Sequence, residues 1–382
     1  MMNNFVFENK TKVYFGKNVV KEHLGVLLSN YGETVMLAYG GGSIKCNGVY
    51  DEIMGILNAQ GKRIVEFSGI MSNPTYQKVQ EGAKLARENH VDLILAVGGG
   101  SVSDCCKVIS AQANLNEDIW EMQYTKHTLP TKFIPLGTIV TVFGTGSEMN
   151  NGAVITHEEK KIKGALWGAQ AEFAFLDPAY SLSVPMQQVI SGAFDTLSHA
   201  METYFGKPDI NNLSDDINEA VMRSVIRNIR ILLTNPENYE ARSEQAWASA
   251  MAENGVLKIG KFTDFQCHML EHQLGAYTNC NHGAGLAVIH PVLYRYIYKS
   301  GAARFAQNVW GIAPKGSDGE TAAGIDALAA FIKEIGLPTT FTELGIPADT
   351  DFRAIADSTN VTAGCCKKLT HDEIYEILQE CL

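Results

Sequence analysis

The sequence lacks any apolar run of about 20 residues, the length that a membrane-spanning helix needs. Its first residues, MMNNFVFENKTK, also lack the apolar stretch of a secretory signal, so we expect a cytoplasmic protein. The eight cysteines contain no CxxC pair and show no disulfide framework, which is typical of reduced thiols in that compartment. Basic residues are not in excess, because the net charge is −11. We therefore expect neither a nucleic-acid partner nor a membrane partner.

The chain is long enough for two domains, since 382 residues are more than one ordinary hydrophobic core organises. In the first half, apolar runs of strand length alternate with helix-like segments. The predicted strands are 34–39, 63–67, 91–97 and 132–136. This alternation predicts a parallel, doubly wound, Rossmann-like sheet. From about Met186 onward only helical periodicity remains. We predict an α/β domain that binds a dinucleotide over residues 1–180 and an all-helical domain that binds a metal over residues 181–382.

Two of the predicted strands run into the same four residues, GGGS, at 40–43 and 98–101. Glycine at a strand-to-helix turn lets the backbone approach a phosphate, and the helix N-terminus adds N–H groups and a positive dipole end. Neither loop has the GxGxxG fingerprint, so the usual dinucleotide signature is absent. Thr138, Thr141 and Thr145 mark a third loop, after the strand predicted at 132–136. The three loops favour a nucleotide site; tight turns without a ligand are the alternative.

His268, His272 and His282 fall within fifteen residues of one another, and Asp195 and His199 form a second pair upstream. A spacing of four places two side chains on one helix face, about 5–6 Å apart at Cβ. A carboxylate with imidazoles suits Zn²⁺, Fe²⁺ or Mn²⁺. The pattern therefore predicts a metal site. The alternative interpretation is that these are ordinary core or surface histidines. For the neighbouring cysteines at 267 and 280, metal binding is an alternative to being ordinary reduced thiols.

In this order along almost the whole chain, the motifs resemble those of the iron-containing, or group III, alcohol dehydrogenases, especially their NADPH-dependent butanol dehydrogenase branch. The segments that carry the resemblance are YGGGSIKCNG, SNPTY, AVGGGSVSDCCK, TGSEMNNGAVIT, LDPAYSLSVP, DTLSH and NHGAG. The resemblance implies hydride transfer between NADP(H), with NAD(H) less favoured, and a small aliphatic aldehyde or primary alcohol. It also implies one divalent metal, Fe²⁺ or Zn²⁺, and a homo-oligomer, a dimer.

The resemblance also assigns single residues. The family's metal positions fall on Asp195, His199, His268 and His282. His272 matches the family's histidine beside the nicotinamide and the substrate. The dinucleotide positions fall on Gly41, Gly42, Ser43, Asn73, Gly99, Gly100, Ser101, Asp104, Thr141, Thr145 and Lys163, with Thr138 as a neighbour.

The choice of cofactor is predicted from the segment 39–45, YGGGSIK, which has no acidic residue. NAD-specific sites place an acid near a strand end, where its carboxylate accepts from the ribose 2′-hydroxyl and repels a 2′-phosphate. Here Ser43 offers a donor and Lys45 a positive charge for a phosphate. The segment therefore predicts NADP(H). The alternative is that Lys45 is an ordinary solvated lysine.

His272 lies one helical turn from His268, where it can carry a proton, because imidazole titrates near the working pH. A role as an orienting group or as a ligand is an equal alternative. Four protein ligands exceed the three of a typical catalytic zinc, which favours Fe²⁺.

Two other functional classes are weighed against a dehydrogenase. A lyase of the dehydroquinate-synthase type shares this architecture and uses NAD and a metal. Such an enzyme needs a basic pocket for a phosphorylated substrate, yet no Lys or Arg occurs at 193–205 or 265–285. A regulator that binds metal and nucleotide without turnover is the third class, and the added His272 disfavours it.

Overall fold

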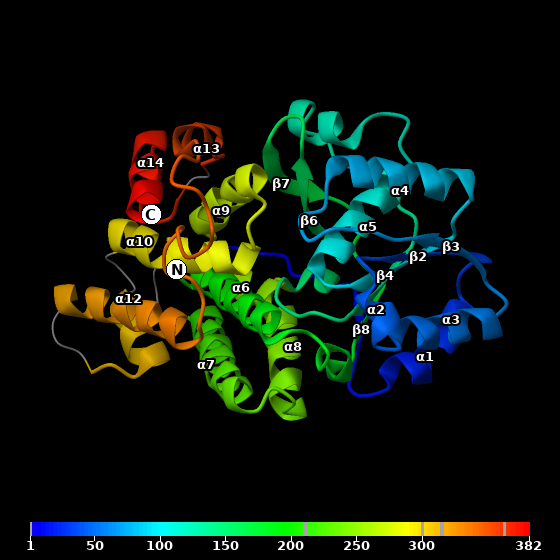
Figure 1. The fold of residues 1–382 in the computed structure, drawn as a ribbon, viewed down its shortest axis with the longest axis horizontal. Helices are drawn as coiled ribbons and strands as arrows, with labels where there is room; N and C mark the ends of the chain where they lie inside the picture. The colour runs from blue at the N-terminus through cyan, green and yellow to red at the C-terminus, as the bar shows by residue number, and fades with distance from the viewer. Residues whose placement is uncertain (1, 209–211, 299–301, 314–316, 362–363) are drawn as a thin grey trace. The chain divides into compact units, whose positions relative to one another are not determined.

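The computed structural model describes residues 2–208, 212–298, 302–313, 317–361 and 364–382 (Figure 1). The chain divides into two compact units. One comprises Glu8–Pro185, and the other comprises Met186–Leu382 with the described N-terminal residues up to Phe7. These N-terminal residues pack with the second unit, since the backbone N–H of Asn3 donates to the carbonyl of Gly260 over 3.1 Å. The first unit is α/β and the second is helical, so the predicted fold class is confirmed.

A six-stranded sheet, parallel throughout, forms the centre of the α/β unit, in the order β1-β8-β5-β4-β2-β3. Its strands are β1 (Lys12–Phe15), β2 (Thr34–Tyr39), β3 (Arg63–Phe67), β4 (Leu93–Gly98), β5 (Leu136–Val140) and β8 (Phe173–Leu176). Tyr39 at the end of β2 pairs with Val97 near the end of β4. Because the strands are parallel and in this register, both GGGS loops leave the same edge of the sheet.

Helices cover both faces of this sheet, α4 and α5 on one side and α1 and α3 on the other (Figure 1). The helices are α1 (Val19–Leu28), α2 (Ser43–Cys46), α3 (Val49–Ala59), α4 (Tyr76–Glu88) and α5 (Gly100–Gln112). Successive residues of β2 alternate between the two cores: Met36 packs with α4 and α5, and Leu37 packs with α1 and α3. A strand buried on both faces reads as a continuous apolar run, which is why TVMLAY was recognisable.

The fourth predicted strand is wrong in its position. Residues 132–135 are not a strand, and β5 runs from Leu136 to Val140, through part of the segment predicted as a loop. The β-branched residues of β5 are buried between β4 and β8, whose pairing decides the register. Thr138 therefore lies inside the sheet with no exposed surface. The prediction that Thr138 lies in a loop is therefore wrong, and its role as a neighbour of the nucleotide stays a prediction.

An antiparallel hairpin and two sheet strands were not predicted. The hairpin consists of β6 (Gly152–His157) and β7 (Ile162–Trp167), and the strands are β1 and β8. β1 and β8 have only four residues each, too few to show a clear period in the sequence. They become strands because each pairs in register with the other, from Lys12 opposite Phe173 to Phe15 opposite Leu176.

The second unit is helical. Its helices are α6 (Met186–Tyr204), α7 (Leu213–Thr234), α8 (Tyr239–Glu253), α9 (Gln266–Thr278), α10 (His282–Ile297), α11 (Ala302–Arg304), α12 (Ser317–Glu334), α13 (Phe352–Ser358) and α14 (His371–Glu380). α6 lies among α7, α8 and α10, so its second half is buried all round (Figure 1). Among the described residues, no helix combines the length and hydropathy that a bilayer span requires. Polar side chains on so buried a helix need hydrogen-bond or ionic partners, so α6 is a candidate element of a functional site.

Candidate metal centre and nucleotide loops

Helix α6 contributes the first pair of predicted metal ligands. Asp195 and His199 stand one turn apart on one face, and the carboxylate oxygen Oδ1 of Asp195 lies 3.6 Å from Nδ1 of His199. Both side chains are at most one-tenth exposed. A carboxylate in such a place is costly to keep ionised unless a cation or hydrogen bonds compensate it.

Helices α9 and α10 bring the other two predicted ligands to the same carboxylate. Nε2 of His268 lies 3.5 Å from Oδ1 of Asp195, and Nε2 of His282 lies 3.4 Å from it. His282 is the first residue of α10, whose start is capped by the side chain of Asn281 accepting from the N–H of Ala284. The ligand atoms of Asp195, His268 and His282 all lie within 4.8 Å of one another. His199 approaches this group through its contact with Asp195.

These residues fit a divalent cation. Within the described residues, Oδ1 of Asp195, Nδ1 of His199 and Nε2 of His268 are buried and have no hydrogen-bond partner. Unsatisfied buried polar atoms each cost about 1–3 kcal/mol, and three that converge on one point are the signature of a missing partner. One oxygen with imidazole nitrogens is a donor set that Zn²⁺ and Fe²⁺ both accept.

Burial and mutual contacts set the protonation states of these residues. Burial alone would raise the pKa of Asp195, but His199 and His282 hold it well below its usual value, so Asp195 is ionised. Burial lowers the pKa of His199 to about 4, which leaves that imidazole neutral at pH 7. Burial also lowers the pKa of His268, but Glu202 and then Asp195 raise it more, to about 10. Metal binding releases such a proton, because a ligating imidazole is neutral.

Two acidic residues that the sequence analysis did not single out also lie at this centre. Oε2 of Glu202 accepts from Nδ1 of His268, and Oε2 of Glu271 accepts from Nδ1 of His282. Helical spacing carried a signal for both, because Glu202 follows His199 by three residues and Glu271 follows His268 by three.

His272 lies at the edge of the same group. Its ring centre is 5.9 Å from that of His268 and 5.6 Å from that of His282, and its side chain is buried. Its ligand atom is within 4.8 Å of those of Glu271 and His282. This placement serves a proton carrier and a ligand equally. Cys267, by contrast, packs into the helical core, and burial raises the pKa of its thiol well above the usual value.

In the α/β unit, the second GGGS loop forms the start of helix α5. Gly99 is the N-cap residue, and no side chain of the described residues caps this helix end. The first N–H groups of α5 are therefore left for another acceptor, as in helix N-termini that bind phosphate. The hydroxyl of Ser101 donates to the carbonyl of Ser72, which holds the segment containing Asn73 beside this helix end.

The loop after β5 closes on the same helix end. A Cβ added to Gly100 would lie 2.1 Å from Oγ1 of Thr145, and one added to Gly99 would lie 3.2 Å from Cβ of Val142. At Gly100 a side chain would therefore clash with Thr145, whereas at Gly99 it would fit only tightly. The N–H of Thr141 donates to the carbonyl of Gly98 over 2.9 Å and continues the sheet into the loop.

Of the other predicted nucleotide residues, Asp104 has a carboxylate that is already engaged. It accepts from the hydroxyl of Ser147 and from the N–H of Val154, the latter over 2.8 Å. Asp104 therefore fixes the segment after β5 to helix α5. Lys163 lies on β7 and is buried. The first GGGS loop is more open, because a Cβ added to Gly41 or Gly42 would have no atom of the described part of the chain within 4 Å.

The structure adds an acid beside Lys45 that the segment 39–45 does not contain. The ammonium of Lys45 lies 3.6 Å from Oε2 of Glu66 on β3. The hydroxyls of Tyr39 and Tyr50 donate to the two oxygens of this carboxylate over 2.6 Å and 2.8 Å. The hydrogen bond from Tyr39, followed by that from Tyr50, lowers the pKa of Glu66, so the group is ionised. The positive charge of Lys45 is thus partly neutralised.

Comparison with known families identifies the protein family to which the metal centre and the nucleotide loops belong. Residues 10–178 match the family model described as iron-containing alcohol dehydrogenase, and residues 189–382 match the C-terminal model of the Fe-containing alcohol dehydrogenase family. The chain belongs to the iron-containing alcohol dehydrogenases. It is therefore an NAD(P)-dependent oxidoreductase of alcohols and aldehydes that uses a pyridine nucleotide and a metal.

Individual members of the family agree over nearly their full length. NADH-dependent butanol dehydrogenase A of Clostridium acetobutylicum is 35% identical and aligns over 99% of this chain and 100% of its own. NADPH-dependent aldehyde reductase YqhD of Escherichia coli is 35% identical over 90% of both chains. The crystal structure of NADH-dependent butanol dehydrogenase A of Thermotoga maritima superposes with a TM-score of 0.94 at 33% identity, covering 100% of this chain and 99% of that one.

These findings confirm the family that the motifs predicted and give no support to a lyase of the dehydroquinate-synthase type. They leave the choice of nucleotide open, because the relatives include both NADH-dependent and NADPH-dependent enzymes.

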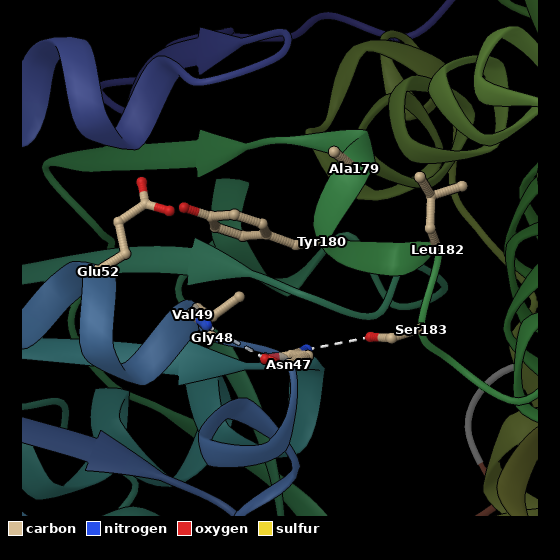
Figure 2. A pocket seen from close by; sticks show the side chains of 8 residues that line it. All are labelled: Asn47, Gly48, Val49, Glu52, Ala179, Tyr180, Leu182 and Ser183. Atoms are coloured by element: carbon tan, nitrogen blue, oxygen red, sulfur yellow. Dashed lines mark hydrogen bonds between the residues drawn. The ribbon is translucent and has the colours of Figure 1, made fainter.

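The α/β unit of this dehydrogenase also contains a pocket of about 360 Å³ (Figure 2). One wall is the connection from α2 to α3 and the other is the turn after β8; the lining residues are Asn47, Gly48, Val49, Glu52, Ala179, Tyr180, Leu182 and Ser183. The amide of Asn47 donates to the hydroxyl of Ser183 over 3.0 Å and links the walls. The hydroxyl of Tyr180 points toward the carboxylate of Glu52 (Figure 2). Burial, and then Glu52, raises the pKa of Tyr180.

Proposed function

We propose that this dehydrogenase is an NADPH-linked reductase of small aliphatic aldehydes, which also oxidises the corresponding primary alcohols. The convergence of the ligand atoms of Asp195, His268 and His282 within 4.8 Å is the observation that carries the proposal. With His199 they would hold one divalent ion, and the four-ligand set favours Fe²⁺ over a three-ligand zinc. A cytoplasmic location and a dimeric state stay predictions.

When bound, the metal supplies a Lewis acid for the carbonyl oxygen and the nicotinamide supplies the hydride. The chain's own residues do the rest. The uncapped start of α5 and the open loop at Gly41 and Gly42 bind the nucleotide phosphates. His272, buried beside the ligand group, holds or moves the proton that the alcohol oxygen gains or loses.

The pocket beside the α2–α3 connection is the proposed place of the adenosine. One of its walls is the turn that follows the carboxyl end of β8, and open α/β sheets bind ligands at the carboxyl ends of their strands. Ala179→Trp would fill part of it. We expect that variant to weaken NADPH and NADH alike in a fluorescence titration, and unchanged affinity for both would place the adenosine elsewhere.

The proposal is tested by following NADPH and NADH absorbance with butyraldehyde, with and without a chelator. We expect kcat/KM to favour NADPH at least tenfold, because the segment 39–45 has no acid to repel a 2′-phosphate and Ser43 and Lys45 can bind one. We expect chelation to abolish turnover. Equal or better rates with NADH would contradict the cofactor assignment, and full activity after complete metal removal would contradict the metal.

Three variants test which residues determine the preference for NADPH over NADH. Gly41→Asp introduces a carboxylate into open space and is expected to erase or reverse it. Lys45→Ala is expected to weaken NADPH with little gain for NADH. Glu66→Gln removes the charge that faces Lys45 at 3.6 Å, so it is expected to increase the preference for NADPH. Glu81→Gln is the matched control, because Glu81 makes a comparable surface pair with Lys78 over 3.3 Å.

A further inference from the structure

Two of the proposed metal ligands share an arrangement that the family assignment does not explain. In both His268 and His282, Nδ1 contacts a carboxylate while Nε2 faces Asp195. The carboxylates come from different helices, Glu202 from α6 and Glu271 from α9. Both are essentially inaccessible, at 1% and 0% exposure.

The contact selects one form of each imidazole. A neutral imidazole has one N–H and one lone pair, and its partner decides which nitrogen carries the proton. A carboxylate can only accept, so Nδ1 of His268 and of His282 carries the hydrogen. In the neutral form, the lone pair is then on Nε2, the nitrogen that lies 3.5 Å (His268) or 3.4 Å (His282) from Oδ1 of Asp195. That is the form in which an imidazole binds a cation, and an anionic partner makes it a stronger donor.

Glu202 fixes the position of His268 as well as its proton. Its carboxylate accepts from the backbone N–H of Cys267 over 2.7 Å and from that of His268 over 3.3 Å. These groups lie in the first turn of α9, where the N-cap residue Phe265 provides no side-chain hydrogen bond. Glu202 therefore holds the start of the helix and the ligand ring together.

Glu271 makes the corresponding link between α9 and α10. It stands one turn beyond His268 and reaches His282 at the start of α10. A Cβ added to Gly285 would lie 3.0 Å from Cγ of Glu271 and 3.2 Å from its Oε1, so glycine at this position leaves room for the carboxylate. The Glu271 carboxylate contacts the edge of the His282 ring opposite Asp195, which favours an orienting role over a ligand role.

We propose that Glu202 and Glu271 are positioning residues that hold His268 and His282 in the metal-binding tautomer and set the affinity of the centre for its cation. This inference rests on the proposed ligand set. Partners of this kind contribute about 10–100-fold to metal affinity in other sites. Glutamine is the replacement used at both positions, because an amide keeps the size of the side chain and one acceptor but removes the charge.

The test is a Co²⁺ titration of the metal-stripped full chain, followed by visible absorption and by competition with a chelator. We expect Glu202→Gln and Glu271→Gln to bind Co²⁺ about 10–100-fold more weakly than the wild type, with an altered ligand-field spectrum. Glu219→Gln is the matched control. It removes another buried carboxylate of the helical unit, one that accepts from Tyr204 and Asn308, and should leave the affinity unchanged.

Affinities within threefold of the wild type in both variants, with an unchanged spectrum, would overturn the proposal. An equal loss in Glu219→Gln would also overturn it, since the effect would then be one of general stability. Failure of the ligand set itself is distinguishable. In that case the wild type would not bind one Co²⁺ per chain, or His282→Ala would bind it as well as the wild type.

Discussion

Replacing either His268 or His282 with alanine is expected to reduce kcat for butyraldehyde by about 10³-fold or more, because the loss of a Lewis acid removes several kcal/mol of transition-state stabilisation. Each imidazole has one nitrogen within 3.5 Å of Asp195, so each variant opens the ligand group. His282→Ala is the cleaner change, since that side chain is 25% exposed whereas His268 is enclosed. The measurements are steady-state turnover and metal content per chain.

His371→Ala is the control for this prediction, because His371 is exposed at the start of α14 and lies outside the ligand group. It should retain wild-type metal content and rate. Circular dichroism should show that the helical unit is intact in all three variants. A ligand variant that kept more than a tenth of the wild-type rate with unchanged metal content would remove that histidine from the ligand set.

His272→Ala is expected to retain the metal and yet lower kcat by about 10²–10⁴-fold, the usual loss of a general acid–base group. His272 lies beside the ligand rings, 5.6 Å from His282 between ring centres, so it can exchange a proton with a substrate bound there. Exogenous imidazole should restore part of the rate, because a diffusible base can replace a proton carrier but not a packing contact. Turnover and metal content are measured on the same preparation.

His272→Gln separates the alternatives for this residue. It keeps a hydrogen-bonding side chain that cannot carry a proton at neutral pH, so it should be as slow as His272→Ala if proton transfer is the role. Loss of the metal from either variant would make His272 a ligand. A wild-type rate in the glutamine variant would leave it an orienting group.

Much of the fold could be predicted from the sequence, because the relevant forces act locally. The strand β2 is buried on both faces and so appears as six apolar or β-branched residues in a row. The pairs Asp195–His199 and His268–His272 share a helix face whatever packs against them, since 3.6 residues complete a turn. The glycine loops follow their strands directly. Because β2 and β4 are parallel, both loops lie at the carboxyl ends of the strands.

The register of short strands was decided by partners far along the chain. β8 is a strand because it lies between β1 and β5, and its four residues show no period of their own. The same pairing extends β5 to Val140 and buries Thr138 within the sheet. A sequence window around Thr138 contains neither partner, and for that reason it was predicted to lie in a loop.

The sequence by itself determined the candidate donor set, the two glycine loops and the division into an α/β part and a helical part. Only the tertiary structure decided which charges meet. Glu202 contacts His268, which lies 66 residues further along the chain, and Glu66 on β3 contacts Lys45 on α2. Helical and strand periodicity place a residue on a face, but the element that packs against that face is selected by the fit of buried side chains over the whole unit. The contacts of Glu202 with His268, of Glu271 with His282 and of Glu66 with Lys45 are therefore properties of the packing.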